Sequence, residues 1–129
     1  ERDLADRMNA IGLPGVYFRP MRFEPTSNKF AGQSCGGVFV HVTDRDAFSP
    51  VESYLALIVE VRNLAPGEFA WREAPYEFVS DRPAIDLLFG SDRVRKGIEA
   101  GDTFDRIAEF WREDVAAFRK RRSQYLIYR

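Results

Sequence analysis

The residues with the most obvious potential for chemistry are one thiol and one imidazole, Cys35 and His41. A cysteine nucleophile needs a base and an orienting group within hydrogen-bonding distance. If both residues lie on one strand, their separation along the sequence places them roughly 20 Å apart. A cysteine protease centre is therefore disfavoured, and Cys35 is interpreted as a structural residue. His41 lies on the less apolar face of that strand, where it can contact a ligand or be a half-buried imidazole with satisfied polar atoms.

The sequence contains no specific motif for a metal, phosphate or nucleic-acid site. A single cysteine excludes an intramolecular disulfide and a multi-thiolate zinc site, and one histidine removes most other ligand sets for transition metals. Gly36 and Gly37 lie outside any GxGxxG or GxxxxGK[ST] pattern, and paired glycines before a strand more often mark a close backbone approach. The basic run at residues 119–122 falls where cations favour the negative end of a helix dipole. No metal or cofactor is expected.

Acidic side chains are too numerous to nominate a catalytic pair. Glycosidases use two carboxyl groups about 5 to 9.5 Å apart, and 20 acidic residues offer many accidental pairs. The 20 acidic residues nearly balance 19 basic residues. The resulting net charge of -1 gives no chain-wide electrostatic field for binding nucleic acid or anionic lipid. The longest apolar run, residues 54–59, is far shorter than the roughly 20 residues of a membrane span. We therefore expect no nucleic-acid partner and no membrane insertion.

Helical spacing and strand alternation organise the first half of the chain. A short helix is expected to end at Gly12, because glycine adopts the left-handed conformation of a helix C-cap. Val16–Phe23 is rich in β-favouring residues but contains Pro20, so we predict an edge strand or two extended pieces. Residues 24–34 predict a long loop. Residues 38–42 alternate valines with other side chains and predict a strand.

Capping and breaking residues organise the second half. Ser49-Pro50-Val51-Glu52 matches a capping box and predicts a helix starting at Pro50, which we expect to be largely buried. Residues 69–72 and 76–79, separated by Glu73-Ala74-Pro75, suggest short strands or extended segments. Two short helices are predicted up to Gly90 and Gly101. The last helix is expected to have Asp102 as N-cap. Its predicted buried stripe is Phe104, Ile107, Ala108, Trp111, Val115 and Phe118.

The order of these elements predicts an α+β fold. Helices are interspersed among a few short strands, and no βαβ unit repeats. With 129 residues, 45% of them hydrophobic, we expect a single compact domain over residues 1–129. Its sheet is expected to be small, mostly antiparallel and packed against several helices. The chain opens in a helix without an initiator Met, which suggests a fragment or a processed chain.

Several short motifs recur in the order found in one bacterial family. They are Leu13-Pro14-Gly15, Phe18-Arg19-Pro20, Phe23-Glu24-Pro25-Thr26, Lys29, Gly32, Cys35-Gly36-Gly37-Val38, His41-Val42-Thr43-Asp44, Ile85-Asp86-Leu87-Leu88-Phe89-Gly90-Ser91 and Tyr125-Leu126-Ile127-Tyr128. The chain resembles, over essentially its whole length, the C-terminal domain of the NamZ-type exo-β-N-acetylmuramidases.

The resemblance implies that this chain is one part of a two-domain glycoside hydrolase. Such enzymes remove terminal N-acetylmuramic acid from peptidoglycan fragments in a cleft between a Rossmann-like N-terminal domain and this smaller domain. The N-terminal domain of the parent protein is the expected partner and the expected source of the catalytic carboxylate. We therefore assign no catalytic residue here and expect the chain alone to be inactive. Action on cell-wall material implies a periplasmic or secreted parent. The alternative is a non-enzymatic glycan-binding or interdomain scaffold module.

The long loop and the strand that follows it are the expected substrate-binding region, because loops on rigid scaffolds often carry binding groups. The lactyl carboxylate of N-acetylmuramic acid needs a cation or backbone N–H groups, and the pyranose face stacks on an aromatic ring. Lys29 and Phe23 can supply these groups; alternatively, Phe23 belongs to the core and Lys29 is solvated. The expected substrate-binding residues are Phe23, Pro25, Thr26, Lys29, Gly36, Gly37 and His41.

Overall fold

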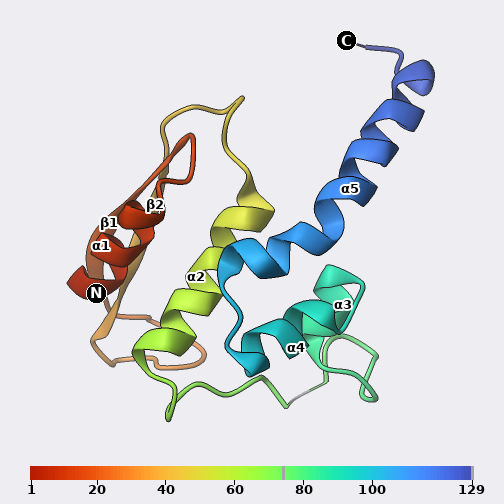
Figure 1. Cartoon of the computed structure of the whole chain (residues 1–129). Helices are drawn as coiled ribbons and strands as arrows, with labels where there is room; N and C mark the ends of the chain where they lie inside the picture. The colour runs from red at the N-terminus through yellow and green to blue at the C-terminus, as the bar shows by residue number, and fades with distance from the viewer. Residues whose placement is uncertain (74, 129) are drawn as a thin grey trace. The chain divides into compact units, whose positions relative to one another are not determined.

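A computed structural model describes residues 1–73 and 75–128 and divides the chain into two compact units, Glu1–Phe69 and Ala70–Arg129 (Figure 1). The first unit contains α1 (Arg2–Ile11), β1 (Val16–Phe23), β2 (Cys35–Val42) and α2 (Pro50–Leu64). The second contains α3 (Ala84–Phe89), α4 (Arg93–Ala100), α5 (Phe104–Arg122) and the 3-10 helix η1 (Ser123–Tyr125). Helices combined with an antiparallel β1–β2 sheet confirm the α+β class. A single domain over residues 1–129 stays a prediction.

The strands form a hairpin whose register explains how Pro20 fits inside a strand. Phe18 lies opposite Val40, and Pro20 lies opposite Val38. The side chain of Asn9 in α1 donates to the carbonyl oxygen of Phe18 at 2.8 Å and accepts from its N–H at 2.9 Å. The polar backbone groups of Phe18 therefore point away from β2, and so does the nitrogen of Pro20 two residues later. β1 is thus a continuous strand whose proline removes no hydrogen bond from the ladder.

One face of the hairpin supplies the core of the first unit. Phe18 is buried and faces the layer formed by α1, which packs in turn against α2. Helix α1 ends as predicted at Gly12, whose φ of 72° is left-handed. The other buried apolar residues of this unit are Ala5, Met8, Leu55, Ala56 and Val59. Burial of this single cluster fixes which face of the hairpin points outward.

Helix α2 departs from the prediction in two respects. It starts at Pro50 as predicted, but the Ser49 side chain makes no capping hydrogen bond, so the predicted capping box does not form. The expectation of a largely buried helix is also wrong, since Val51 is 54% exposed and Tyr54 is 53% exposed. The buried residues are Ser53, Leu55, Ala56 and Val59. Within its unit α2 packs against α1, and one neighbouring helix covers one stripe only.

The second unit is held by close contact between its helices. Helices α3 and α4 end at Gly90 and Gly101 as predicted, both left-handed. A Cβ on Gly97 of α4 would lie 2.8 Å from Ile107 of α5, so the missing side chain allows these helices to approach. The predicted N-cap of α5 is one residue early, because the hydroxyl of Thr103 accepts from the N–H of Arg106.

The buried stripe of α5 is shorter than predicted. Its buried residues are Phe104, Ile107 and Ala108, whereas Val115 and Phe118 are exposed. The part of α5 that contacts α4 is the part that the unit can cover, so apolar periodicity overstated the burial. The cations at residues 119–122 lie in the last turn, as predicted.

The segment between α2 and α3 contains no regular strand among the described residues. Residues 69–72 have no regular secondary structure. Tyr76 and Val79 exchange two backbone hydrogen bonds of 3.1 Å across a tight turn, with Glu77 at a φ of 53°. Residues 76–79, predicted as a short strand or an extended segment, therefore form a turn. Ala74, in the predicted separator, lies outside the described residues.

Candidate functional site

The outward face of the hairpin carries exposed aromatic rings. Side chains alternate along a strand, so the residues that flank Phe18 point to the opposite face. In register, this outward face contains the pairs Tyr17 and His41, Arg19 and Phe39, Met21 and Gly37, and Phe23 and Cys35. Tyr17 is 51% exposed, Phe23 44% and Phe39 45%. The hairpin therefore buries one face in its own unit and leaves an aromatic face uncovered.

Phe23 and Gly37 come together at the loop end of this face. A Cβ on Gly37 would lie 3.3 Å from Cε1 of Phe23, so the phenyl ring lies over the glycine. The exposure of Phe23 shows that the alternative placing it in the core is wrong. A side chain at Gly37 would require the ring to move by a few tenths of an ångström.

Gly36 points to the other face of the hairpin, beside Glu1. A Cβ on Gly36 would lie 2.8 Å from the Glu1 carboxylate. That carboxylate accepts from Nε of Arg22 at 2.8 Å, and this hydrogen bond holds the pKa of Glu1 below its ordinary value. Gly36 thus permits close approach of a charged pair and does not lie beside Phe23 on the aromatic face.

The loop at residues 24–34 presents its polar groups at the surface. It is closed by a hydrogen bond from the N–H of Gly32 to the carbonyl oxygen of Pro25, at 2.9 Å. Pro25 is half-buried, whereas Thr26 and Lys29 are exposed. The ammonium group of Lys29 lies 5.0 Å from the ring centre of Phe30, its neighbour in the chain. The loop therefore offers a cation and a hydroxyl near the end of the aromatic face.

Cys35 and His41 lie near opposite ends of β2, so they form no nucleophile–base pair, as predicted. The thiol of Cys35 is half-buried and donates to the carbonyl oxygen of Gln33 at 3.6 Å. Its contact is local and structural. His41 is on the same face as Gly37, but four residues along β2 separate them by roughly 13 Å.

A cluster around Arg19 lies at the His41 end of the face. The sequence motifs include Arg19, in Phe18-Arg19-Pro20, but predict no binding role for it. Its Nε donates to Nε2 of His41 at 3.2 Å. Its guanidinium carbon lies 5.6 Å from the ring centre of Phe39, and the rings of Phe39 and His41 are 4.7 Å apart. Strand alternation places Arg19 on the outward face, but only the register between β1 and β2 brings it to His41.

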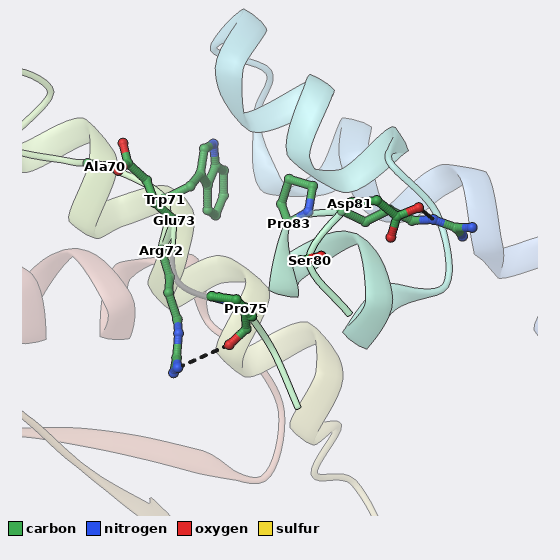
Figure 2. A pocket seen from close by; sticks show the side chains of 9 residues that line it. Ala70, Trp71, Arg72, Glu73, Pro75, Ser80, Asp81 and Pro83 are labelled. Atoms are coloured by element: carbon green, nitrogen blue, oxygen red, sulfur yellow. Dashed lines mark hydrogen bonds and ion pairs between the residues drawn. The ribbon is translucent and has the colours of Figure 1, made fainter. Parts of the chain in front are cut away.

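The second unit contains open hollows around Pro83. One, of about 400 Å³, is shown in Figure 2, where Trp71 points toward Pro83. Within it, Arg72 donates to the carbonyl oxygen of Pro75 at 3.4 Å, and Arg82 pairs with Asp81 at 3.7 Å. Sequence reasoning assigned no site to this surface and interpreted residues 69–72 and 76–79 as short strands or extended segments.

A second hollow of the same unit borders an ion-pair network. It has a volume of about 460 Å³ and is lined in part by Asp86 and Arg95. Nε and Nη2 of Arg95 donate to the Asp86 carboxylate at 2.9 to 3.1 Å, and these bonds raise the pKa of Arg95. Arg95 also donates to Glu99, which accepts from the indole N–H of Trp71 at 2.9 Å. This network connects α3, α4 and the segment before them.

The family model "Exo-beta-N-acetylmuramidase NamZ, C-terminal" matches residues 1–128 of the chain. The chain belongs to the NamZ C-terminal family. It is 36% identical over 126 residues to the peptidoglycan β-N-acetylmuramidase NamZ of Bacillus subtilis, covering 98% of this chain and 28% of that protein. The chain is also similar to a crystal structure of a DUF1343 family protein from Bacteroides fragilis, with a TM-score of 0.79 and 28% sequence identity. The match covers 99% of this chain and 33% of the B. fragilis chain. The predicted family is confirmed, and the chain spans about a third or less of these relatives.

In this NamZ C-terminal domain the predicted site residues fall into separate groups. Phe23 and Gly37 touch, and the loop residues Pro25, Thr26 and Lys29 follow in the chain. Gly36 points to the other face, and His41 lies farther along β2. Within residues 1–73 and 75–128, no group of three or more histidine, cysteine or acidic residues is arranged to hold a metal ion. Among the same residues, no helix is both long and apolar enough to cross a membrane.

Proposed function

We propose that this NamZ C-terminal domain forms one wall of the cleft in which a peptidoglycan exo-β-N-acetylmuramidase binds terminal N-acetylmuramic acid. The observation that carries the proposal is the uncovered aromatic face of the hairpin, with Tyr17, Phe23 and Phe39 each about half exposed. Aromatic rings that combine an apolar face with nearby polar groups suit the apolar face of a pyranose and its hydroxyl rim. The B. subtilis relative is a β-N-acetylmuramidase, which supports the choice of sugar.

In this proposal the domain binds substrate and its partner domain breaks the bond. The sequence match covers 28% of the B. subtilis protein, which leaves room for a catalytic domain of the Rossmann-like kind. The carboxyl groups that protonate the leaving oxygen and stabilise the sugar cation are assigned to that domain. Because the substrate is cell-wall material, the parent protein is expected to act in the periplasm or outside the cell.

A binding experiment tests the assignment of the hairpin face. We would titrate the chain with N-acetylmuramic acid at millimolar concentrations and follow the backbone amide resonances by NMR. The expected result is a set of shifts confined to β1, β2 and the loop at residues 24–34. Shifts centred on Trp71 and Arg82 would contradict the assignment and favour the hollow of the second unit. The absence of any shift would contradict it and favour the scaffold alternative.

An activity experiment tests the division of labour. We would compare hydrolysis of a chromogenic N-acetylmuraminide by this chain, by the N-terminal part of B. subtilis NamZ, and by a fusion of that part to this chain. Only the fusion is expected to turn over substrate, and Phe39→Ala in the fusion should raise KM more than it lowers kcat. Turnover by this chain alone at the rate of the fusion would overturn the proposal.

A further inference from the structure

Arg19 is held in one orientation by two residues of the neighbouring strand. His41 accepts from its Nε, and the ring of Phe39 lies beneath its guanidinium group. The hydrogen bond requires a neutral imidazole whose proton is on Nδ1, since Nε2 acts as the acceptor. Contacts of this kind reduce the conformational entropy that a long side chain loses when it binds a ligand.

The edge of the guanidinium formed by Nη1 and Nη2 has no protein partner within the described residues. Two other arginines of the same unit have carboxylate partners: Arg7 pairs with Glu60, and Arg22 pairs with Glu1. Two parallel N–H groups on a fixed guanidinium match the two oxygens of a carboxylate. Arg19 is therefore oriented for a carboxylate that its own unit does not supply.

We propose that Arg19 recognises the carboxylate of an acidic sugar, with His41 as the residue that positions it. This inference rests on the proposed function, in which the hairpin face binds N-acetylmuramic acid, and it adds the group that distinguishes this sugar from neutral sugars. Tyr17 lies on the same face, opposite His41 in the register, and its exposed ring is available to the pyranose. Arg19 thus takes the role that sequence reasoning predicted for Lys29.

The surroundings of the two cations favour Arg19 over Lys29. Lys29 contacts the ring of the adjacent Phe30, in an exposed loop. Arg19 is flanked by two exposed aromatic rings on a paired strand, which is a more rigid support than a loop. A charged partner held in place in advance gives stronger selection for a carboxylate than a solvated ammonium group.

The test compares three sugars and four forms of the chain. The sugars are N-acetylmuramic acid, its methyl ester, which lacks the negative charge, and N-acetylglucosamine. The forms are the wild type, Arg19→Met, Lys29→Met and Arg45→Met, the last of which removes an exposed cation outside the face. Affinities are measured by NMR titration, and the quantity compared is the preference for the acid over its ester.

We expect the wild type to bind the acid about tenfold more tightly than the ester, because charge-assisted bonds to carboxylates contribute on this scale. Arg19→Met should abolish the preference, and the Lys29 and Arg45 variants should keep it. A preference that survives in Arg19→Met, or that disappears in Lys29→Met instead, would overturn the inference. If the wild type bound the acid and its ester equally, Arg19 would be excluded as the carboxylate-binding residue and the proposed function would stand. Binding of none of the sugars would overturn the proposed function itself.

Discussion

The outward face of the hairpin and the network between α3 and α4 use similar side chains in opposite ways. Arg95 donates to two acidic residues of its own unit, and the neighbouring indole of Trp71 donates to one of them. Arg19 contacts an imidazole and a phenyl ring, and its outer N–H groups have no partner in the described part of the chain. The first arrangement satisfies its charges internally and contributes to folding. The second leaves hydrogen-bonding capacity for a ligand.

The largest expected effect separates the two faces of the hairpin. Phe18→Ala removes a buried ring from the core and should lower the free energy of unfolding by about 3–5 kcal/mol. Phe39→Ala removes an exposed ring from the outward face and should cost only about 0.2–1 kcal/mol, the scale of a cross-strand contact. Urea unfolding followed by circular dichroism measures both. Equal losses would mean that the outward face also stabilises the fold.

The next effect tests the internal network. Asp86→Ala should leave Arg95 without its principal partner. The Arg95 side chain is only 21% exposed and the Asp86 side chain only 10% exposed. We expect the midpoint of thermal unfolding to fall by roughly 5–10 °C. Asp81→Ala is the matched control, because its pair with Arg82 is exposed and 3.7 Å long. A similar fall in both variants would contradict a special role for the network.

A smaller effect tests the positioning role of His41. His41→Gln keeps an acceptor that can reach Nε of Arg19, whereas His41→Leu removes it. We expect the leucine variant to lose about three- to tenfold of the preference for the acidic sugar, and the glutamine variant to retain most of it. Thermal unfolding should show similar stability for both. Identical preferences in the two variants would show that Phe39 alone suffices to hold Arg19.

The smallest effect is a pH dependence in the second unit. Lys96 lies 2.6 Å from Asp92, and this bond lowers the pKa of Asp92 below its ordinary value of 3.8. A lowered folded-state pKa stabilises the fold above the ordinary value, and this contribution is lost as pH falls through the folded value. Asp92→Asn should therefore slightly lower the unfolding midpoint at pH 7 and leave it unchanged near pH 2. A larger difference in unfolding midpoint between variant and wild type at pH 2 than at pH 7 would contradict this pH dependence.

Local signals in the sequence were sufficient for most element boundaries. Gly12, Gly90 and Gly101 end helices because a residue without Cβ adopts the left-handed conformation at no steric cost. Pro50 starts a helix because its fixed φ suits the first turn. These preferences act within a few residues, so they can be read without knowing the tertiary structure. The order of short motifs was likewise enough to predict the family.

The burial of side chains could not be predicted from such local signals. The apolar periodicity of α2 included Val51 and Tyr54, which are exposed, and that of α5 included Phe118, which is also exposed. Periodicity reports which residues could be buried, whereas the neighbouring elements decide how much of the stripe is covered. The apparent strand at residues 76–79 is a turn because its backbone bonds within the segment rather than to a second strand.

The candidate site shows the same division. Spacing predicted that Cys35 and His41 do not meet if they share a strand, and the structure places both on β2. Only the tertiary structure brought Arg19 to His41, because the pairing of β1 with β2 depends on the register that Asn9, Phe18 and the buried core select. A shift of one residue would exchange the faces and bury Arg19 in place of Phe18. The sequence thus determined which side chains are available on the hairpin, and packing of one face against α1 decided which of them remain exposed.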